Sequence, residues 1–139
     1  MRRIAMVCVL ITALAACATA QNQASAKQSA ENAAQSWLAL VDKADYGTSW
    51  EQAASMFKSH VTKDKWQEMI ASVRGPLGKV LSRKLINATF ATELPGAPDG
   101  QYVVIQYETS FEHKKSAVET ITPMLDKDGQ WRVSGYFIR

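Results

Sequence analysis

Apolar positions in the first half of the chain recur with the spacing of α-helices. One stripe with i, i+3, i+4 and i+7 spacing predicts a helix from about residue 26 to residue 43. Its members are Ala30, Ala33, Ala34, Trp37, Leu38 and Val41. We expect Gly47 to close this helix, because glycine readily adopts the left-handed conformation found at many helix C-termini.

Two further helices are predicted before residue 78. Ser49, followed three residues later by Gln52, matches a capping box at the start of a helix, and Thr62 is a favourable N-cap for another. The apolar stripes are Trp50, Ala53, Ala54 and Phe57 in the second helix and Trp66, Met69, Ile70 and Val73 in the third. Residues 74–76 (Arg-Gly-Pro) are expected to end the third helix, because proline removes a backbone donor. Each helix places one tryptophan on its stripe, which indicates core packing.

After Gly78 the sequence changes to β-branched and aromatic residues, which favour strands. The predicted strands are Val80–Glu93, Gln101–Glu112, Ala117–Asp126 and Gln130–Ile138. Residues 94–100 have turn composition, residues 113–116 form a hairpin tip, and Asp128-Gly129 is a two-residue hairpin turn. The chain is therefore predicted to be an α+β domain, with three N-terminal helices packed on a four-stranded antiparallel meander. This arrangement has the general look of cystatin-like and nuclear-transport-factor-two-like folds.

The Asp128-Gly129 turn also predicts the register of the last hairpin. It pairs Met124, Thr122 and Thr120 with Val133, Gly135 and Phe137, in that order. The expected core face carries Val118, Met124, Trp131, Val133 and Phe137, and the opposite face carries Glu119, Ile121, Leu125, Arg132, Tyr136 and Ile138. The second face is more apolar than a solvated sheet side, so we expect a second subunit or a ligand to cover part of it. Pro123 is expected to mark a bulge, which would reverse the faces on one side of it.

Residues 1–16 have the pattern of a signal peptide. Arg2 and Arg3 precede an apolar run from Ile4 to Ala16 that only Thr12 interrupts. This run is shorter than the roughly 20 residues that a membrane-spanning helix needs, and it has the length of a signal-peptide core. It is followed by a lipobox, Leu14-Ala15-Ala16-Cys17, and then by an A-x-A site, residues 18–20, before Gln21.

Both cleavage sites remain open, and we favour the lipobox. Cleavage there would leave Cys17 to be acylated, with residues 17–26 as a flexible linker and residues 27–139 as a single domain. Ala18 directly after the cysteine points to the outer membrane. The alternative is a free periplasmic protein that begins at Gln21.

Charge and cysteine content exclude several classes of function. The chain has 16 Lys and Arg against 13 Asp and Glu, a net charge of +3, of which the leader residues Arg2 and Arg3 supply two. A mature protein this close to neutral has no electrostatic basis for binding nucleic acid. Both cysteines, Cys8 and Cys17, lie in the first 17 residues, so the folded domain has neither disulfides nor a cysteine metal site.

Catalytic and metal-binding motifs are weak throughout the sequence. His60 and His113 lie in polar segments, and no serine stands in a G-x-S-x-G elbow. We predict no metal site, no cofactor and no catalytic residue. Carboxylates on strands, namely Glu93, Glu108 and Glu119, are the remaining route to acid–base chemistry. Arg83, Lys84 and Arg132 are either a small anion-binding patch or cross-strand partners of these carboxylates.

Several stretches resemble a known family. SWLALVDKADYGTSW, VRGPLGKVLSRKL, LPGAPDGQYVVIQYETSF and WRVSGYFIR are similar to the domain of unknown function 4019 family, which contains short exported bacterial proteins. The resemblance extends over about residues 26–139. It implies a shared fold and export, and it implies no activity and no functional residue.

We therefore predict an exported envelope protein with a non-enzymatic binding or interaction domain. Its partner would be another protein, a second copy of the chain or a small apolar ligand, and lipidated Cys17 would attach it to the membrane. The candidate binding residues on the semi-apolar sheet face are Tyr102, Tyr107, Ile121, Arg132 and Tyr136. The alternative is a small enzyme with a pocket and a carboxylate acid or base.

Overall fold

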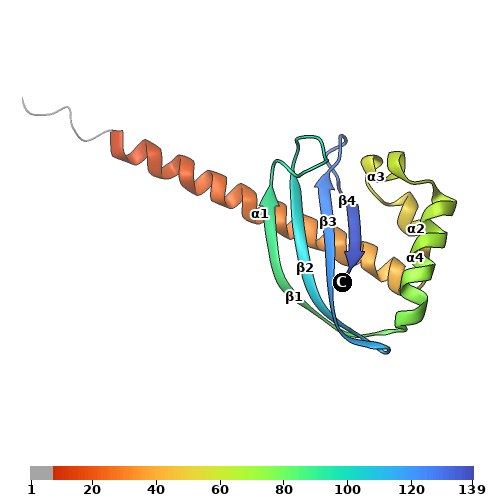
Figure 1. Cartoon of the computed structure of the whole chain (residues 1–139). Helices are drawn as coiled ribbons and strands as arrows, with labels where there is room; N and C mark the ends of the chain where they lie inside the picture. The colour runs from red at the N-terminus through yellow and green to blue at the C-terminus, as the bar shows by residue number, and fades with distance from the viewer. Residues whose placement is uncertain (1–7) are drawn as a thin grey trace, which may run out of the picture.

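The computed structural model describes residues 8–139, which form an α+β domain with a long helix projecting from it (Figure 1). Arg2, Arg3 and the start of the predicted signal-peptide core lie outside the described residues. Four helices precede a four-stranded antiparallel sheet, so the predicted fold class is confirmed and the predicted count of three helices is wrong. The helices are α1 (Cys8–Asp42), α2 (Tyr46–Glu51), α3 (Ser55–His60) and α4 (Lys63–Leu77).

Helix α1 has an exposed half and a buried half. Residues 15–25 are all exposed, whereas Ala30, Ala34 and Leu38 are fully buried against the rest of the domain. Residues 17–26, predicted as a flexible linker, are helical, because alanine and glutamine are good helix formers. Within residues 8–139, no helix is both long enough and apolar enough to cross a membrane.

The second predicted helix is split into α2 and α3, because its middle docks onto the sheet. Ala53 and Ala54 are fully buried, and the Ala54 N–H donates to the Val133 carbonyl at 2.8 Å. Ala54 is extended (φ −60°, ψ 151°), which interrupts the helical hydrogen bonds. The predicted capping box is also wrong: Asp45 caps α2, and Ser49 lies inside the helix.

The other helix ends confirm one prediction and correct two. Thr62 caps α4 as predicted, accepting from the Lys65 N–H at 3.3 Å. Helix α4 continues through Pro76 to Leu77, and Gly78, with φ +75°, is its C-cap. The left-handed residue after α1 is Ala44 (φ 60°), whereas Gly47 lies within α2.

The sheet has the predicted meander order β1-β2-β3-β4. Its strands are β1 (Val80–Ala91), β2 (Tyr102–Phe111), β3 (Lys114–Leu125) and β4 (Trp131–Ile138). The last turn contains Asp128-Gly129, with Gly129 at φ +81°, but it is one residue longer than predicted: the Asp126 N–H donates to the Gln130 carbonyl, which leaves residues 127–129 as the loop. The register of β3 with β4 shifts between Thr122 and Pro123, where the bulge was predicted. Figure 1 shows α1 crossing one face of this sheet, with α2, α3 and α4 beyond β4.

The helices cover the face of β3 that was predicted to lie opposite the core, and the bulge brings both halves of β4 onto that same face. Thr120 pairs with Phe137 and Thr122 with Gly135 as predicted, but Pro123 then pairs with Val133, so Ser134 is skipped. The helix-covered face therefore carries Trp131 and Val133, as predicted, together with residues predicted on the opposite face, namely Glu119, Ile121, Leu125, Tyr136 and Ile138. Val118, Met124 and Phe137, predicted in the core, lie on the opposite face, where Phe137 is 50% exposed. The semi-apolar face is therefore covered by helices of the same chain.

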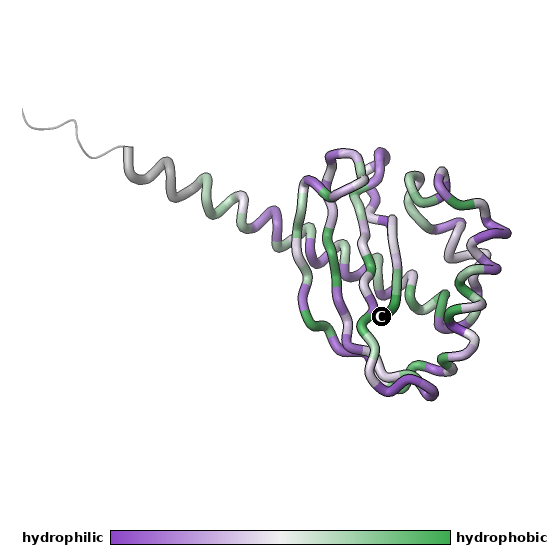
Figure 2. Tube along the Cα trace, viewed as in Figure 1, coloured by the Kyte–Doolittle hydropathy of each residue, from purple (hydrophilic) through white to green (hydrophobic). Residues whose placement is uncertain are grey.

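The core lies between α1 and the helix-covered face of the sheet. Alternate residues of β2 are buried there, namely Val103, Ile105, Tyr107, Thr109 and Phe111. Hydrophobic and hydrophilic positions alternate along the helices and strands of the domain (Figure 2). Three tryptophans, Trp37, Trp66 and Trp50, lie in or against the core, which confirms their predicted packing role.

Candidate binding site

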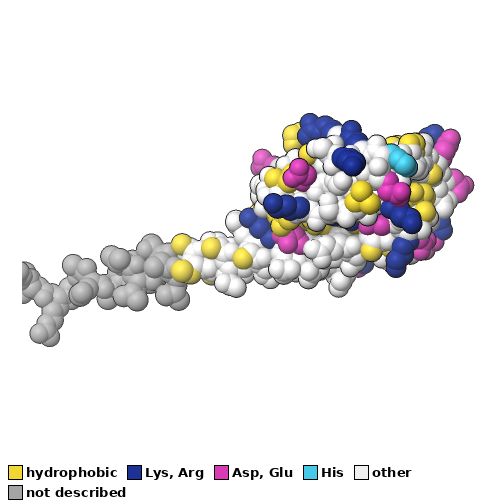
Figure 3. Space-filling model, turned by 90° about the horizontal axis from the view of Figure 1, so that it is seen from below, with side chains coloured by type: hydrophobic (Ala, Val, Ile, Leu, Met, Phe, Trp, Pro, Cys, Tyr) yellow, Lys and Arg dark blue, Asp and Glu magenta, His cyan; other side chains and the backbone are white. Residues whose placement is uncertain are grey.

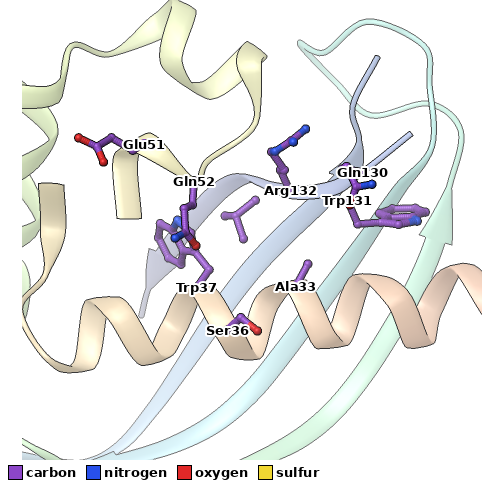
Figure 4. Close-up of a pocket in the computed structure, with 9 residues that line it drawn as sticks. Ala33, Ser36, Trp37, Glu51, Gln52, Gln130, Trp131 and Arg132 are labelled. Atoms are coloured by element: carbon purple, nitrogen blue, oxygen red, sulfur yellow. The ribbon is translucent and has the colours of Figure 1, made fainter. Parts of the chain in front are cut away.

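A cavity of about 380 Å³ lies between α1, the end of α2 and the start of β4 (Figure 4). We call it the β4-edge cavity, and its lining residues are Ala33, Ser36, Trp37, Glu51, Gln52, Gln130, Trp131, Arg132 and Val133. Five of these nine side chains are polar or charged. Its volume lies in the range typical of small-molecule sites.

The floor of the β4-edge cavity is rigid. Trp37 is 2% exposed, and its indole N–H donates to the Ser49 carbonyl at 2.8 Å. Its ring also packs edge-to-face on Tyr136, with 5.3 Å between ring centroids. Ser49 in turn accepts from the Trp66 indole at 2.9 Å. These contacts hold the floor in one conformation, so a ligand would meet a preformed surface.

The rim of the same cavity offers hydrogen bonds without a strong charge. Ser36, Gln52 and Gln130 are exposed, and each carries both donor and acceptor capacity. The guanidinium of Arg132 is held by both oxygens of Asp128, at 2.7 and 2.8 Å, and lies 3.4 Å from Asp126. Because two carboxylates surround this one cation, and the carboxylate of Glu51, the other charged lining residue, is paired with Lys63, the cavity has little preference for an anion.

A second cavity of about 370 Å³ adjoins the first and shares Glu51 and Arg132 with it. Asp126, on its wall, accepts from the Ser55 hydroxyl and from the Ser55 N–H at 3.0 Å. The Ser55 hydroxyl bond lowers the pKa of Asp126 to about 2, with help from Ser55 and Lys127 N–H groups and Arg132. The hydrogen bond from Arg132 lowers the pKa of Asp128. Both carboxylates are therefore ionised at neutral pH, and Asp126 ties the β3–β4 hairpin to α3.

Glu119 is the centre of a buried charge network under the helices. It is fully buried and accepts from Arg83 Nε at 2.7 Å, from Arg83 Nη2 at 3.2 Å, and from the hydroxyls of Thr109 and Tyr136. Arg83 also donates to Asp42 at 2.8 and 3.0 Å. The arginine that was predicted as an anion-binding residue is therefore a partner of Glu119, the other alternative considered for it.

The groups at the ends of this network have pKa values shifted by burial and by their partners. Burial tends to raise the pKa of Asp42, but hydrogen bonds and charge from Arg83 and Arg74 outweigh it and lower that pKa. Burial and the neighbouring Glu119 raise the pKa of Tyr136 far above its ordinary value, so its hydroxyl remains a donor. Arg74, 5% exposed, donates to Asp42 at 2.9 Å and stacks over Phe111.

The residues predicted to bind a partner do not form one surface. Tyr107 and Ile121 belong to the core and Tyr136 packs against it, all under the helices. Tyr102 is fully buried, with its hydroxyl donating to the Pro98 carbonyl at 2.6 Å. Of these five residues, only Arg132 lines either of the two cavities described above. Lys84 lies exposed opposite Glu108, away from both Arg83 and Arg132, so the three basic residues form no common patch.

The cavity residues Ser36, Gln52 and Gln130 were not singled out from the sequence. They are ordinary polar surface residues in three separate elements, and only the tertiary structure brings them together. Among residues 15–139, whose side chains the structure describes, no group of three or more His, Cys, Asp or Glu side chains is placed to hold a metal ion.

Comparison with known proteins adds a family and no activity. The model of one family, described as "Protein of unknown function (DUF4019)", matches residues 33–136. That range runs from the buried half of α1 to Tyr136 in β4 and includes all nine residues of the β4-edge cavity. No curated protein matches the chain.

Proposed function

We propose that this chain, which belongs to the DUF4019 family, is an exported, non-enzymatic binding domain of the bacterial envelope. Export is supported by the leader pattern, in which Arg2 and Arg3 precede a short apolar run. Anchoring is supported by the lipobox, and Cys17 lies exposed on the projecting half of α1. The order of the elements, with helices before a four-stranded antiparallel meander, supports a likeness to cystatin-like and nuclear-transport-factor-two-like folds.

The β4-edge cavity is the proposed binding site, and its ligand is a small, polar, uncharged molecule. The observation that carries this proposal is its lining, with hydrogen-bonding side chains on the rim, a rigid tryptophan floor, and a cation already balanced by Asp126 and Asp128. A small apolar ligand, the earlier expectation from the sequence, fits this lining less well, because entering it would desolvate polar groups without satisfying them.

Acid–base catalysis by Glu119 is not favoured by its surroundings. Its two oxygens already accept four hydrogen bonds, two of them from Arg83, and the side chain is fully buried. A general base needs a free lone pair within reach of a substrate proton. Glu93 and Glu108 are exposed and lie outside both cavities.

Native mass spectrometry of protein purified from its own envelope tests the binding proposal. We expect extra mass that dissociates on denaturation. Ser36→Trp fills the cavity from an exposed position and should abolish that mass, whereas Ser29→Trp, the same change at an exposed position of α1 outside the cavity, should keep it. Retention of the mass in Ser36→Trp, or its absence from the unaltered protein, would contradict the proposal.

A further inference from the structure

The two cavities beside β4 meet at the side chains of Glu51 and Arg132, which line both of them. The β4-edge cavity extends from this junction toward α1, and the second cavity extends toward α3, where Ser55 and Lys58 line it. Their volumes are similar, at about 380 and 370 Å³. A ligand bound at the junction can therefore extend into both cavities.

The lining of the β4-edge cavity combines apolar surface with hydrogen-bonding groups. Figure 4 shows Ala33 and Trp37 on α1, and Val133 adds a further apolar side chain. Gln52 and Gln130, from the end of α2 and the last turn, supply amide donors and acceptors. A ligand that fits this lining has both an apolar face and uncharged polar groups.

Arg132 presents donors and acceptors side by side at the junction of the cavities. Its Nη1 and Nη2 atoms donate to the two oxygens of Asp128, at 2.7 and 2.8 Å. Among residues 15–139, Asp128 Oδ2 accepts from Arg132 alone, and Arg132 Nε makes no hydrogen bond. A free acceptor thus lies beside a free donor on part-exposed side chains. Hydroxyl groups suit this arrangement, because each of them can both donate and accept.

Ions and peptide strands fit this arrangement less well. The ionised Asp126 and Asp128 would repel an anion, and a cation would have to displace Arg132 from them. An extended peptide cannot pair with β4 at Val133, because the Ala54 N–H already donates to that carbonyl. Basic and acidic side chains are intermixed on the face of the domain in Figure 3, so no region of one sign there would attract an ion.

From these observations, and on the basis of the binding function proposed above, we propose that the ligand is a carbohydrate that extends from the β4-edge cavity into the second cavity. Two neighbouring hydroxyls of one sugar ring bind at the junction, one accepting from Arg132 and the other donating to Asp128 Oδ2. The C–H face of the ring packs on Trp37, and further hydroxyls bond to Gln52 and Gln130. A sugar ring combines these features, since it has an apolar face, paired donors and acceptors, and no charge.

Chemical identification of the bound molecule tests this proposal. The material that dissociates from the purified protein on denaturation is collected, hydrolysed in acid and analysed for monosaccharides. We expect sugar in at least equimolar amount to the protein that carries extra mass. Extra mass without sugar would overturn the carbohydrate proposal and leave the binding function standing, whereas absence of extra mass would contradict both.

Two variants test whether the sugar binds at the junction. Arg132→Lys keeps the charge but loses the planar set of donors, and Gln130→Leu removes an exposed amide from the rim. Both should lose the bound sugar during the same purification. Gln101→Leu, the matched change at an exposed glutamine outside both cavities, should keep it. Unchanged sugar content in Arg132→Lys and Gln130→Leu would overturn the proposed placement.

Discussion

Replacing Arg83 with methionine should destabilise the domain through the carboxylate that it leaves behind. The Arg83 side chain is 17% exposed, and it supplies two of the four hydrogen bonds that the fully buried Glu119 accepts. Breaking a buried ion pair from one side costs about 3–5 kcal/mol, because the remaining charge is uncompensated. Asp42 also loses a partner, but it is 27% exposed and keeps Arg74, so its contribution is small.

The expected loss is therefore about 3–5 kcal/mol in the free energy of unfolding, measured by urea denaturation at pH 7. Lys84→Met is the matched control on the same strand: this lysine is exposed and outside the network, so the change should stay within about 0.5 kcal/mol. Since a loss of 5 kcal/mol can unfold a small domain, Thr109→Val offers a milder probe. It removes one hydroxyl donor to Glu119 and should cost about 1–3 kcal/mol.

The double variant Arg83→Met with Glu119→Met tests whether the uncompensated Glu119 carboxylate causes the loss of stability. Replacing both charges by apolar side chains removes the uncompensated carboxylate, so the double variant should recover most of the stability that Arg83→Met loses. A loss below 1 kcal/mol in Arg83→Met, or a double variant less stable than that single variant, would refute the reasoning. The first result would mean that water reaches Glu119, and the second that packing of the Arg83 stem is the larger effect.

Three further predictions concern pH, backbone conformation and processing. Because the pKa of Asp126 is lowered to about 2, its contribution to stability is complete above about pH 4 and is lost as the pH falls toward 2. The stability of Asp126→Asn, measured by acid unfolding, should not show this loss between about pH 4 and pH 2. Gly78→Ala should lower the melting temperature, since φ is +75° and the new Cβ would meet Glu112 at 2.9 Å, whereas Gly75→Ala, in open space on a helix, should raise it slightly. The denatured mass of Cys17→Ser protein should lack the acyl chains that we expect on the unaltered protein, and a mature terminus at Gln21 in both proteins would contradict lipidation.

Local features of this chain could be predicted because neighbouring residues produce them. The stripe from Ala30 to Val41 and the Thr62 cap depend on contacts within a few residues, and the structure has both. A turn at Asp128-Gly129 is also present, although its loop is one residue longer than predicted. The four strands lie within three residues of their predicted bounds, since β-branched and aromatic residues favour extended backbone. The family resemblance was confirmed as well.

Features that depend on contacts distant in sequence could not be predicted. A hydrogen bond from Ala54 to Val133, 79 residues away, divides the second predicted helix. The docking of the helices likewise decides which face of the sheet is covered: Ile121 and Tyr136, predicted to bind a partner, lie beneath them, and the skipped Ser134 brings Val133 onto that same face. The β4-edge cavity likewise combines α1, α2 and β4.

The sequence by itself therefore determined the kind and order of the elements, the leader pattern and the family. The tertiary structure alone decided which side of the sheet is buried and which polar residues meet. The physical reason is that periodicity records only that one face of an element is apolar, whereas the docking of whole elements, through single hydrogen bonds and a one-residue bulge, decides what that face contacts.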